Sequence, residues 1–408
     1  MSETDFDIVV VGGGMVGASL ACALGASGLR IAVIEAVALG DPGQPSYDDR
    51  TIALAYSSRR IFEGIGVWES IAERSASPIE HIHISDRGHF GFTRLHASDM
   101  GIAALGYVAE TRALGAALYE VMASYSNITL VCPAKVVDVS IAADSATLSI
   151  EREGGIETLS THLAVAADGG ESPLRRAVGI LASKHEYQQT AIVANVTPGR
   201  DHNNTAYERF TKTGPLALLP MTGRRCAVVW STTKDNVDTI MGWSDEEYLA
   251  QLQARFGDRL GQFERVGKRV AYPLALTRVK DSVSERIALI GNAAHTVHPV
   301  AGQGFNLGLR DVATLAQVIV DAHRAGRDFG TLEVLTSYAK WRRRDNQRVA
   351  AFTDGLIRIF ANDLLPLALA RNAGLVFVDL FPSIKRTFIR RTSGLNGRLP
   401  RLARGLPL

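Results

Sequence analysis

Short apolar runs alternate with helix-like patterns over the first part of the chain, an order that is typical of a parallel α/β sheet. Residues 8–11 form one such run and predict a buried strand, while residues 18–26 predict a helix rich in small side chains. Residues 30–34 then predict a second strand. A strand, a helix and a strand in this order predict a Rossmann-like unit at the N-terminus.

The same kind of pattern returns twice further along the chain. Residues 163–168 predict a strand, and the next helix is expected to begin at Pro173 with Ser172 as its N-cap, because proline and serine are favoured at those two positions. Residues 286–291 predict another strand. After it, apolar residues at helical spacing predict a helix that begins near Phe305.

The middle and the end of the chain follow other patterns. Residues 183–273 contain strand-like segments, such as 190–196 and 226–231, which predict a second, antiparallel sheet. Apolar residues at intervals of three or four from 349 to 360 predict an amphipathic helix. That helix could pack on the body of the protein or meet a lipid or a partner.

Composition bounds the class of protein. A chain of 408 residues exceeds one average domain, and 46% hydrophobic against 21% charged residues is the profile of a soluble globular protein. The three cysteines are few and far apart, which favours reduced thiols in the cytoplasm over a disulfide framework. We expect neither a signal peptide nor a membrane span, because the start is acidic and no apolar run approaches the roughly 18 residues that a span needs.

Charge is distributed unevenly, although the net charge is only +2. From Arg342 to Leu408 the chain carries 13 Lys and Arg against 4 Asp and Glu, and no acidic residue follows Asp379. A basic tail favours binding to an anionic lipid surface or to an acidic partner. A solvated, partly disordered tail is an equally good interpretation.

A glycine-rich turn follows the first predicted strand. Gly12, Gly14 and Gly17 have the spacing that permits, in turn, a tight turn, a close approach to a phosphate and close packing of the helix on the sheet. Glu35 ends the second strand, where a carboxylate accepts hydrogen bonds from ribose hydroxyls and repels a 2′-phosphate. The motif therefore indicates FAD or NAD rather than NADP, without deciding between the two.

Two further segments favour a flavin. The predicted strand that ends at Asp168 leads into the capped turn, and a loop with Pro299, Gly302 and Gly304 precedes the helix near Phe305. The positive end of that helix faces whatever the loop holds, and it would stabilise the negative charge of a reduced flavin ring. The sequence thus predicts one extended FAD, touched at its pyrophosphate by the first motif and at its ring by the last.

These motifs, in their order and spacing, resemble those of the class A flavoprotein aromatic hydroxylases. Within that group, residues 298–311 match the signature of the ubiquinone-biosynthesis hydroxylases at every position, and residues 48–54 and 209–220 also look like family segments. The resemblance covers residues 5 to about 350. Asn292 stands where most members have aspartate, and here the chain resembles the 2-octaprenyl-6-methoxyphenol hydroxylase branch. Its amide oxygen can still accept a hydrogen bond from a ribityl hydroxyl.

The resemblance implies an α/β fold, in which a Rossmann-like FAD-binding domain carries an inserted antiparallel β-sheet substrate domain and a C-terminal helical segment. The expected boundaries are 1–75, 105–181 and 276–345 for the FAD-binding domain, 76–104 and 182–275 for the substrate domain, and 346–408 for the C-terminal helices and basic tail.

The resemblance also implies which residues meet FAD. They are Gly12, Gly14, Gly17, Glu35, Arg50, Arg112, Asp168, Asn292, Pro299, Gly302, Gln303, Gly304 and Asn306. Arg175 or Arg176 accompanies Asp168 in a motif tied to FAD and to the nicotinamide cofactor. The catalytic side chain is unknown. His298 and Pro299 are the candidates nearest the ring, and for His295 and His298 a structural hydrogen bond within the loop is the favoured alternative.

The implied chemistry is hydroxylation: NADH or NADPH reduces FAD, and molecular oxygen is then used to hydroxylate an electron-rich phenol in a dry pocket. The expected substrate is a hydrophobic polyprenyl phenol. The expected location is cytoplasmic, peripheral to the inner membrane, where the basic C-terminus would meet the membrane surface or a ubiquinone-biosynthesis protein complex. We expect no nucleic-acid partner.

Other interpretations are less favoured. A different class A hydroxylase would act on another aromatic substrate, a non-oxygenating FAD oxidoreductase would lack the Asp168 and Pro299 elements, and a non-catalytic carrier of prenylated molecules would not need Glu35. The pair Glu80 and His83 has the spacing of a di-iron ligand pair, but such a site needs two pairs on facing helices. Because this segment predicts a strand, we expect no metal.

Overall fold

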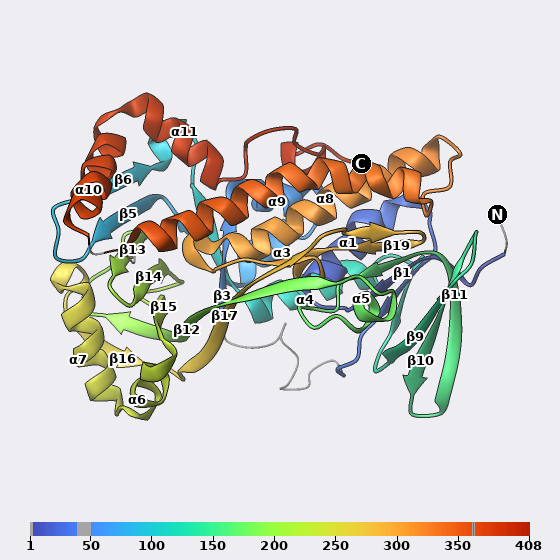
Figure 1. The fold of residues 1–408 in the computed structure, drawn as a ribbon, viewed down its shortest axis with the longest axis horizontal. Helices are drawn as coiled ribbons and strands as arrows, with labels where there is room; N and C mark the ends of the chain where they lie inside the picture. Colours follow the sequence, from blue (N-terminus) through green and yellow to red (C-terminus); the bar gives the residue numbers. More distant parts are fainter. Residues whose placement is uncertain (1–2, 39–49, 361, 363) are drawn as a thin grey trace.

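The computed structural model describes residues 3–38, 50–360, 362 and 364–408. These residues form two large sheets, which are joined by long strands, a small third sheet and the helices that pack on them (Figure 1). The first sheet contains, within these residues, the strands β1 (Phe6–Val11), β2 (Ile31–Ile34), β8 (Ile128–Val131), β9 (Lys135–Ile141), β10 (Ala146–Arg152), β11 (Gly155–Ala166), β18 (Val283–Ser284) and β19 (Ile287–Leu289). Its main order is β18, β19, β11, β1, β2, β8, and the hairpin strands β10 and β9 extend it from β11.

Parallel pairing dominates the centre of this sheet. β1 pairs in parallel with β2 and β11, and β11 pairs in parallel with β19. The four strands predicted from apolar runs are therefore confirmed, and so is the helix between the first two, α1 (Met15–Leu24). The next predicted helix, α5 (Pro173–Ala177), has the expected cap, because the Ser172 hydroxyl accepts a hydrogen bond from the Arg175 N–H at 3.0 Å.

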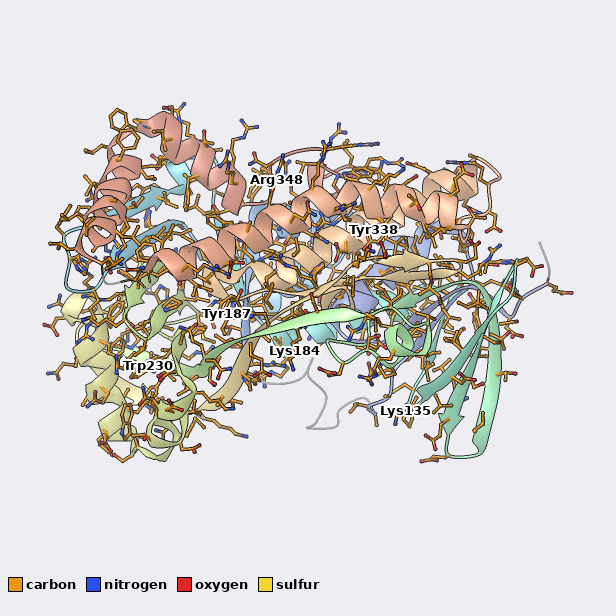
Figure 2. All side chains as sticks on the ribbon, viewed as in Figure 1. Lys135, Lys184, Tyr187, Trp230, Tyr338 and Arg348 are labelled. Atoms are coloured by element: carbon orange, nitrogen blue, oxygen red, sulfur yellow. The ribbon has the colours of Figure 1, made fainter. Side chains whose placement is uncertain are left out.

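Helices share a hydrophobic core with one face of the first sheet. They are α2 (Tyr56–Gly64), α3 (Trp68–Ser75), α4 (Thr111–Ala123), α8 (Gln303–Arg324) and α9 (Leu332–Phe360). α8 begins close to the predicted position, and its apolar face packs with α1, α4 and α9 in the largest core of the described residues. Tyr338 of α9 belongs to this core and donates its hydroxyl to the Leu289 carbonyl at 2.9 Å, which ties α9 to the sheet (Figure 2).

The second sheet has nine strands among the described residues. They are β5 (His81–Asp86), β6 (Phe92–His96), β12 (Ala182–Pro198), β13 (Thr205–Thr211), β14 (Gly214–Pro220), β15 (Cys226–Thr233), β16 (Phe263–Val266), β17 (Val270–Val279) and β20 (His295–Thr296). The order is β20, β17, β12, β15, β14, β13, β5, β6, with β16 beside β12. The predicted strands at 190–196 and 226–231 lie here, and the histidine-rich segment forms β5 and β6 as its pattern predicts. β17 and β20 extend beyond the predicted substrate segments.

The second sheet has its own core. α6 (Val237–Gly242) and α7 (Asp245–Phe256) pack on it around Trp230 and Tyr248. The two helices lie at the lower left of the molecule (Figure 1), and so does Trp230 (Figure 2). β12 and β17 are long, pair with each other over most of their length and run from this core to the first sheet (Figure 1). A small sheet of β3 (Thr51–Ala55), β7 (Gly106–Glu110) and β4 (Ser77–Ile79) lies between the two.

The chain ends in helices that pack beside β5 and β6. They are α10 (Leu365–Leu380) and α11 (Pro382–Thr392), which meet at a bend of 100°. In the described residues no single helix is both long and apolar enough to cross a bilayer, whereas this bent pair passes the same criteria when taken together. The residues after α11 return to the body, where Leu402 and Ala403 join the largest core and Arg398 stacks on Trp341. The end of the basic tail is therefore folded rather than solvated.

Candidate functional site

A cavity of about 970 Å³ lies between the two sheets and is lined by both glycine motifs. The predicted residues that line it are Gly12, Gly14, Glu35, Arg50, Asp168, Asn292, Pro299, Gly302, Gln303, Gly304 and Asn306. The prediction that both motifs face one cleft is therefore confirmed. Of the family segment at 48–54, residues 48 and 49 lie outside the described residues.

The first motif leaves backbone exposed to the cavity. Gly12 has a φ of 102°, and a Cβ there would lie 2.6 Å from the Ala167 carbonyl oxygen. A Cβ at Gly17 would lie 1.9 Å from the Gly12 carbonyl oxygen, so only glycine permits this packing of α1 on the strand. At Gly14 a Cβ would meet nothing within 4 Å, and α1 begins at Met15 without a side-chain cap. The uncapped N–H groups of α1 are thus available to a bound anion.

Glu35 holds the glycine-rich turn in place and can still accept further hydrogen bonds. Its carboxylate accepts hydrogen bonds from the backbone N–H of Gly13 at 2.8 Å and of Val37 at 2.9 Å. Because a carboxylate has about four acceptor positions, it can still accept bonds from a ribose. The Tyr119 hydroxyl donates to the Gly13 carbonyl at 2.8 Å from α4, a contact that no sequence motif signalled.

The last motif turns sharply before α8. Ala301 and Gly302 both have left-handed backbone, with φ of 58° and 61°. A Cβ at Gly302 would lie 2.9 Å from the Ala53 Cβ, so the turn lies tight against β3. A non-glycine residue in this conformation costs about 1 kcal/mol or more, a strain that often marks ligand sites. The result is a second uncapped helix N-terminus, at Gln303 and Gly304, that faces the cavity.

Two polar side chains of this motif hold the loop in place. The Asn306 Oδ1 accepts hydrogen bonds from the Ala55 N–H at 2.7 Å and the Ser58 hydroxyl at 2.6 Å, and its Nδ2 donates to the Ala53 carbonyl at 2.8 Å. The Gln303 Nε2 donates to the Thr392 carbonyl of α11 at 3.2 Å. Both residues line the cavity as expected, but their amides are engaged with the protein's own backbone and, for Asn306, also with the Ser58 hydroxyl.

Asp311 of α8 holds in place the loop that precedes this helix. It accepts hydrogen bonds from the Gly291 N–H at 3.1 Å, from the His295 Nε2 at 2.6 Å and from the Arg342 Nε at 2.6 Å. Burial would raise the pKa of Asp311, but His295 and Arg342 outweigh it and lower that pKa to about 2. Arg342 also pairs with Asp345, so a buried charge network connects α8, α9 and the loop. His295 thus has a structural hydrogen bond.

His298 and Arg112 lie away from the cavity lining. His298 is fully buried, its Nδ1 accepts the Val300 N–H at 3.2 Å, and its ring meets Tyr187 edge-on at 5.1 Å. Burial lowers the pKa of His298 to about 4, so the ring is neutral near pH 7. Arg112 is exposed and forms an ion pair with Glu110 at 3.1 Å. Pro299, the other ring-proximal candidate, does line the cavity.

Asp168 offers the cavity an acceptor. Its Oδ2 accepts the Leu174 N–H at 3.2 Å, whereas its Oδ1 is buried without a hydrogen-bond partner among the described residues. Burial raises the pKa of Asp168, as expected for a carboxyl that lacks full solvation. The neighbouring Arg175 donates to the carbonyls of Ala293 at 2.9 Å and Gly170 at 2.8 Å, which is a structural role. Two uncapped helix ends, a bare position at Gly14 and the acceptors of Glu35 and Asp168 together fit FAD.

The opposite wall of the cavity is apolar. Its lining includes Ile82, Ile84, Leu95, Phe210, Ala217, Leu219 and Val229 from the second sheet and Phe352, Leu356, Phe360, Leu375, Phe388 and Ile389 from the C-terminal helices. Glu208 on β13 interrupts this wall. Sequence motifs missed Glu208, yet a signal existed: Ala206 and Phe210, two residues to either side, are buried and apolar, so strand alternation places Glu208 on the buried face.

Comparisons with known proteins agree with this site. A family model described as FAD binding domain matches residues 5–353. The chain is 40% identical to the ubiquinone hydroxylase UbiL of Rhodospirillum rubrum, over 98% of this chain and 93% of the relative, and 30% identical to the 3-demethoxyubiquinol 3-hydroxylase of Escherichia coli, over 97% and 100%. The crystal structure of p-nitrophenol 4-monooxygenase PnpA from Pseudomonas putida DLL-E4 superposes with a TM-score of 0.81 at 19% identity, over 97% of this chain and 100% of that one, which shows a shared fold.

Proposed function

The chain belongs to the FAD-binding family that includes the ubiquinone hydroxylases and is an FAD-dependent monooxygenase, and from this we propose that it hydroxylates a polyprenylated phenol in ubiquinone biosynthesis. NADH or NADPH donates the electrons, and molecular oxygen supplies the oxygen atom. When bound, FAD supplies the oxygen chemistry, and the protein supplies binding, orientation and exclusion of water.

The observation that carries this proposal is the contrast between the two sides of the cavity. One side presents glycine backbone and helix N-termini, which suit a dinucleotide, and the other presents aliphatic and aromatic side chains. A phenol with an isoprenoid chain matches the second side, because the ring can lie between the walls while the chain buries apolar area. A small, water-soluble aromatic acid would leave that wall unmatched.

Purified protein tests the reaction class directly. We expect a flavin absorbance spectrum, oxidation of NADH or NADPH that increases when a short-chain prenyl phenol is added, and a product that carries one atom of isotopically labelled oxygen from the gas. Cofactor oxidation with an unaltered phenol would instead indicate a non-oxygenating FAD oxidoreductase. A protein that cannot be loaded with flavin would leave only the carrier interpretation.

The position of the hydroxylated carbon needs a cellular experiment. We propose 2-octaprenyl-6-methoxyphenol as the substrate, on the resemblance that Asn292 carries. Mass spectrometry of the quinone precursors that accumulate in a deletion strain tests this choice. Accumulation of a later precursor, such as a demethoxyubiquinol, would assign the chain to another hydroxylation step while leaving the reaction class intact.

A membrane-facing surface suits such a substrate. Large apolar side chains are exposed along α10 and just beyond it: Leu365, Leu369, Phe377, Leu380 and Phe381. Arg386, Arg390 and Arg391 are exposed on the adjoining α11, and basic residues beside an apolar face favour an anionic lipid surface. The inner faces of the same two helices line the cavity through Leu375, Phe388 and Ile389. We propose that these helices lie on an anionic membrane and admit the substrate from it.

Vesicle sedimentation tests this surface. The double variant Leu380→Glu, Phe381→Glu should bind vesicles of phosphatidylcholine and phosphatidylglycerol about tenfold more weakly, because two apolar side chains no longer enter the bilayer. Leu181→Glu is the matched control, since Leu181 is 85% exposed outside these helices. Turnover of a short-chain phenol should not change in either variant. Equal vesicle binding by both variants would overturn the lipid assignment and favour a protein partner.

A further inference from the structure

Glu208 occupies an unusual position on the apolar wall. It lies on β13, where it is paired in register with Ala217 of β14 and Ile84 of β5. Paired residues of adjacent strands project to the same face, so all three side chains face the cavity that they line. Glu208 is therefore a carboxyl group among aliphatic side chains in the cavity that the nucleotide motifs also line.

This carboxyl group has no hydrogen-bond or ion-pair partner among the described residues. Burial alone raises its pKa, to about 7. A carboxylate in an apolar wall costs stability unless it is paired, and an apolar side chain would pack better at this position. A structural role therefore does not account for Glu208, whereas a pKa near neutrality suits an acid–base group.

The charged groups around Glu208 do not explain why its pKa is raised. β4, β14 and β15, which pack against β13 or beside it, carry no charged residue. Charged or titratable groups on the packed elements include Asp86, His81 and His83 on β5, Tyr207 and Arg209 on β13 itself, Asp354 and Arg358 near the end of α9, and Arg371 and Asp379 on α10. Asp86 is paired with Arg371 at 2.8 Å and Asp354 with Arg358 at 2.9 Å. His81, His83 and Arg209 occupy the alternate strand positions, which face away from Glu208.

We propose that Glu208 is the general base that removes the phenol proton of the substrate when its ring is hydroxylated. This assignment rests on the proposed function, because it requires a phenol in the cavity. Electrophilic oxygen transfer needs an electron-rich ring, and a phenolate is far more electron-rich than a phenol. A base beside the ring oxygen therefore raises the reactivity of the ring towards oxygen transfer.

Glu208 accepts the phenol proton and returns it within one turnover. The phenol O–H bond breaks as a carboxyl O–H bond forms, and the electron pair stays on the ring oxygen, from which it activates the ring. After oxygen transfer, the hydroxylated ring carbon loses its hydrogen as a proton to solvent, and the electrons of that C–H bond restore aromaticity. Glu208 then returns its proton to the ring oxygen, so that the residue ends each cycle ionised.

Glu208→Gln tests the base, because glutamine has the same shape and cannot accept the proton. We expect the variant to retain FAD at the wild-type ratio, while its rate of product formation near pH 7.5 falls about 10²-fold to 10³-fold, the usual contribution of a general base. The wild-type rate should rise with pH through a midpoint near 7 and then level off. The variant should lack this midpoint, and its rate should instead follow the ionisation of the phenol itself, near pH 10.

Phenol acidity separates a base from a residue that only shapes the cavity. Fluorinated prenyl phenols, which ionise more readily, should restore the rate of Glu208→Gln far more than they raise the wild-type rate. Glu247→Gln, an exposed Glu on α7, is the control and should behave as wild type throughout. A wild-type pH profile in Glu208→Gln, or an equal loss on every phenol regardless of acidity, would overturn the proposal. If the wild-type protein hydroxylates no phenol although it binds FAD, the proposed function fails instead.

Discussion

The cavity has a nucleotide side, formed by the two glycine motifs, and a substrate side, formed by the apolar residues of the second sheet and the C-terminal helices. Beside the nucleotide side, Asp311 accepts hydrogen bonds from Gly291, His295 and Arg342. On the substrate side, Glu208 has no hydrogen-bond or ion-pair partner among the described residues. Asp311 is fully buried, whereas Glu208 is half-buried in the wall of the cavity. Their surroundings move their pKa values apart, to about 2 for Asp311 and to about 7 for Glu208. A carboxylate that is fully paired holds a framework together, and one that is left unpaired is free to exchange a proton.

The two groups also give opposite pH dependences of folding. Asp311 has a folded pKa below its unfolded value, so its contribution is present above about pH 4 and is lost as the pH falls towards 2. Glu208 has a folded pKa above its unfolded value, so its contribution to stability is fully present below about pH 4.5 and is lost as the pH rises from there to about 7. Variants of either residue therefore test this difference between Asp311 and Glu208.

The largest effect is expected for Asp311→Asn. The variant keeps the shape of the side chain but leaves the buried Arg342 with fewer negative partners, and breaking a buried pair costs about 3–5 kcal/mol. The melting temperature should fall markedly, and FAD should be lost because Gly291 and His295 are no longer anchored. Asp354→Asn, which disrupts a pair with the exposed Arg358, is the control and should cost about 1 kcal/mol or less. Equal melting of both variants would show that the network is not a framework.

The second-largest effect is expected on FAD binding at the first glycine motif. Gly14→Val places a side chain into open cavity space, so the variant should fold but lose most of its FAD, as measured by the ratio of flavin to protein absorbance. Gly17→Ala is the contrasting variant, because its Cβ would lie 1.9 Å from the Gly12 carbonyl oxygen and should destabilise the fold by about 1–3 kcal/mol. Wild-type FAD content in Gly14→Val would contradict a phosphate position at this glycine.

Local patterns were sufficient to predict the nucleotide side. Apolar runs predicted the parallel strands, and glycine spacing predicted the turns, because each depends on neighbours within a few residues of the chain. The sequence could not show that Asn306 bonds to β3, since that strand lies some 250 residues earlier and its position depends on the whole fold. For the same reason, the sequence could not show that Arg112, which the resemblance places at the flavin, forms an ion pair with Glu110.

The substrate side depends more on strand order. Alternation places Glu208 on a buried face, but only the pairing of β13 with β5 and β14 shows that this face forms a cavity wall rather than a packed core. The partners of Asp311 come from the loop before α8 and from α9, so its pairing was equally hidden in the sequence. Unpaired and paired carboxylates look alike until the fold is known.

The smallest expected effect is on the melting temperature, which Glu208→Gln should raise and Asp311→Asn should lower. Glu208→Gln removes a group whose ionisation opposes folding, so at pH 8 its melting temperature should exceed that of the wild type by a few degrees, although the variant is catalytically impaired. At pH 5, where Glu208 is protonated in the folded protein, the two melting curves should nearly coincide. Asp311→Asn should be destabilised at both values, because Asp311 remains ionised throughout this range. A Glu208→Gln variant that is less stable than the wild type at pH 8 would mean that the carboxylate has a stabilising partner, and the contrast between the two sides of the cavity would no longer hold.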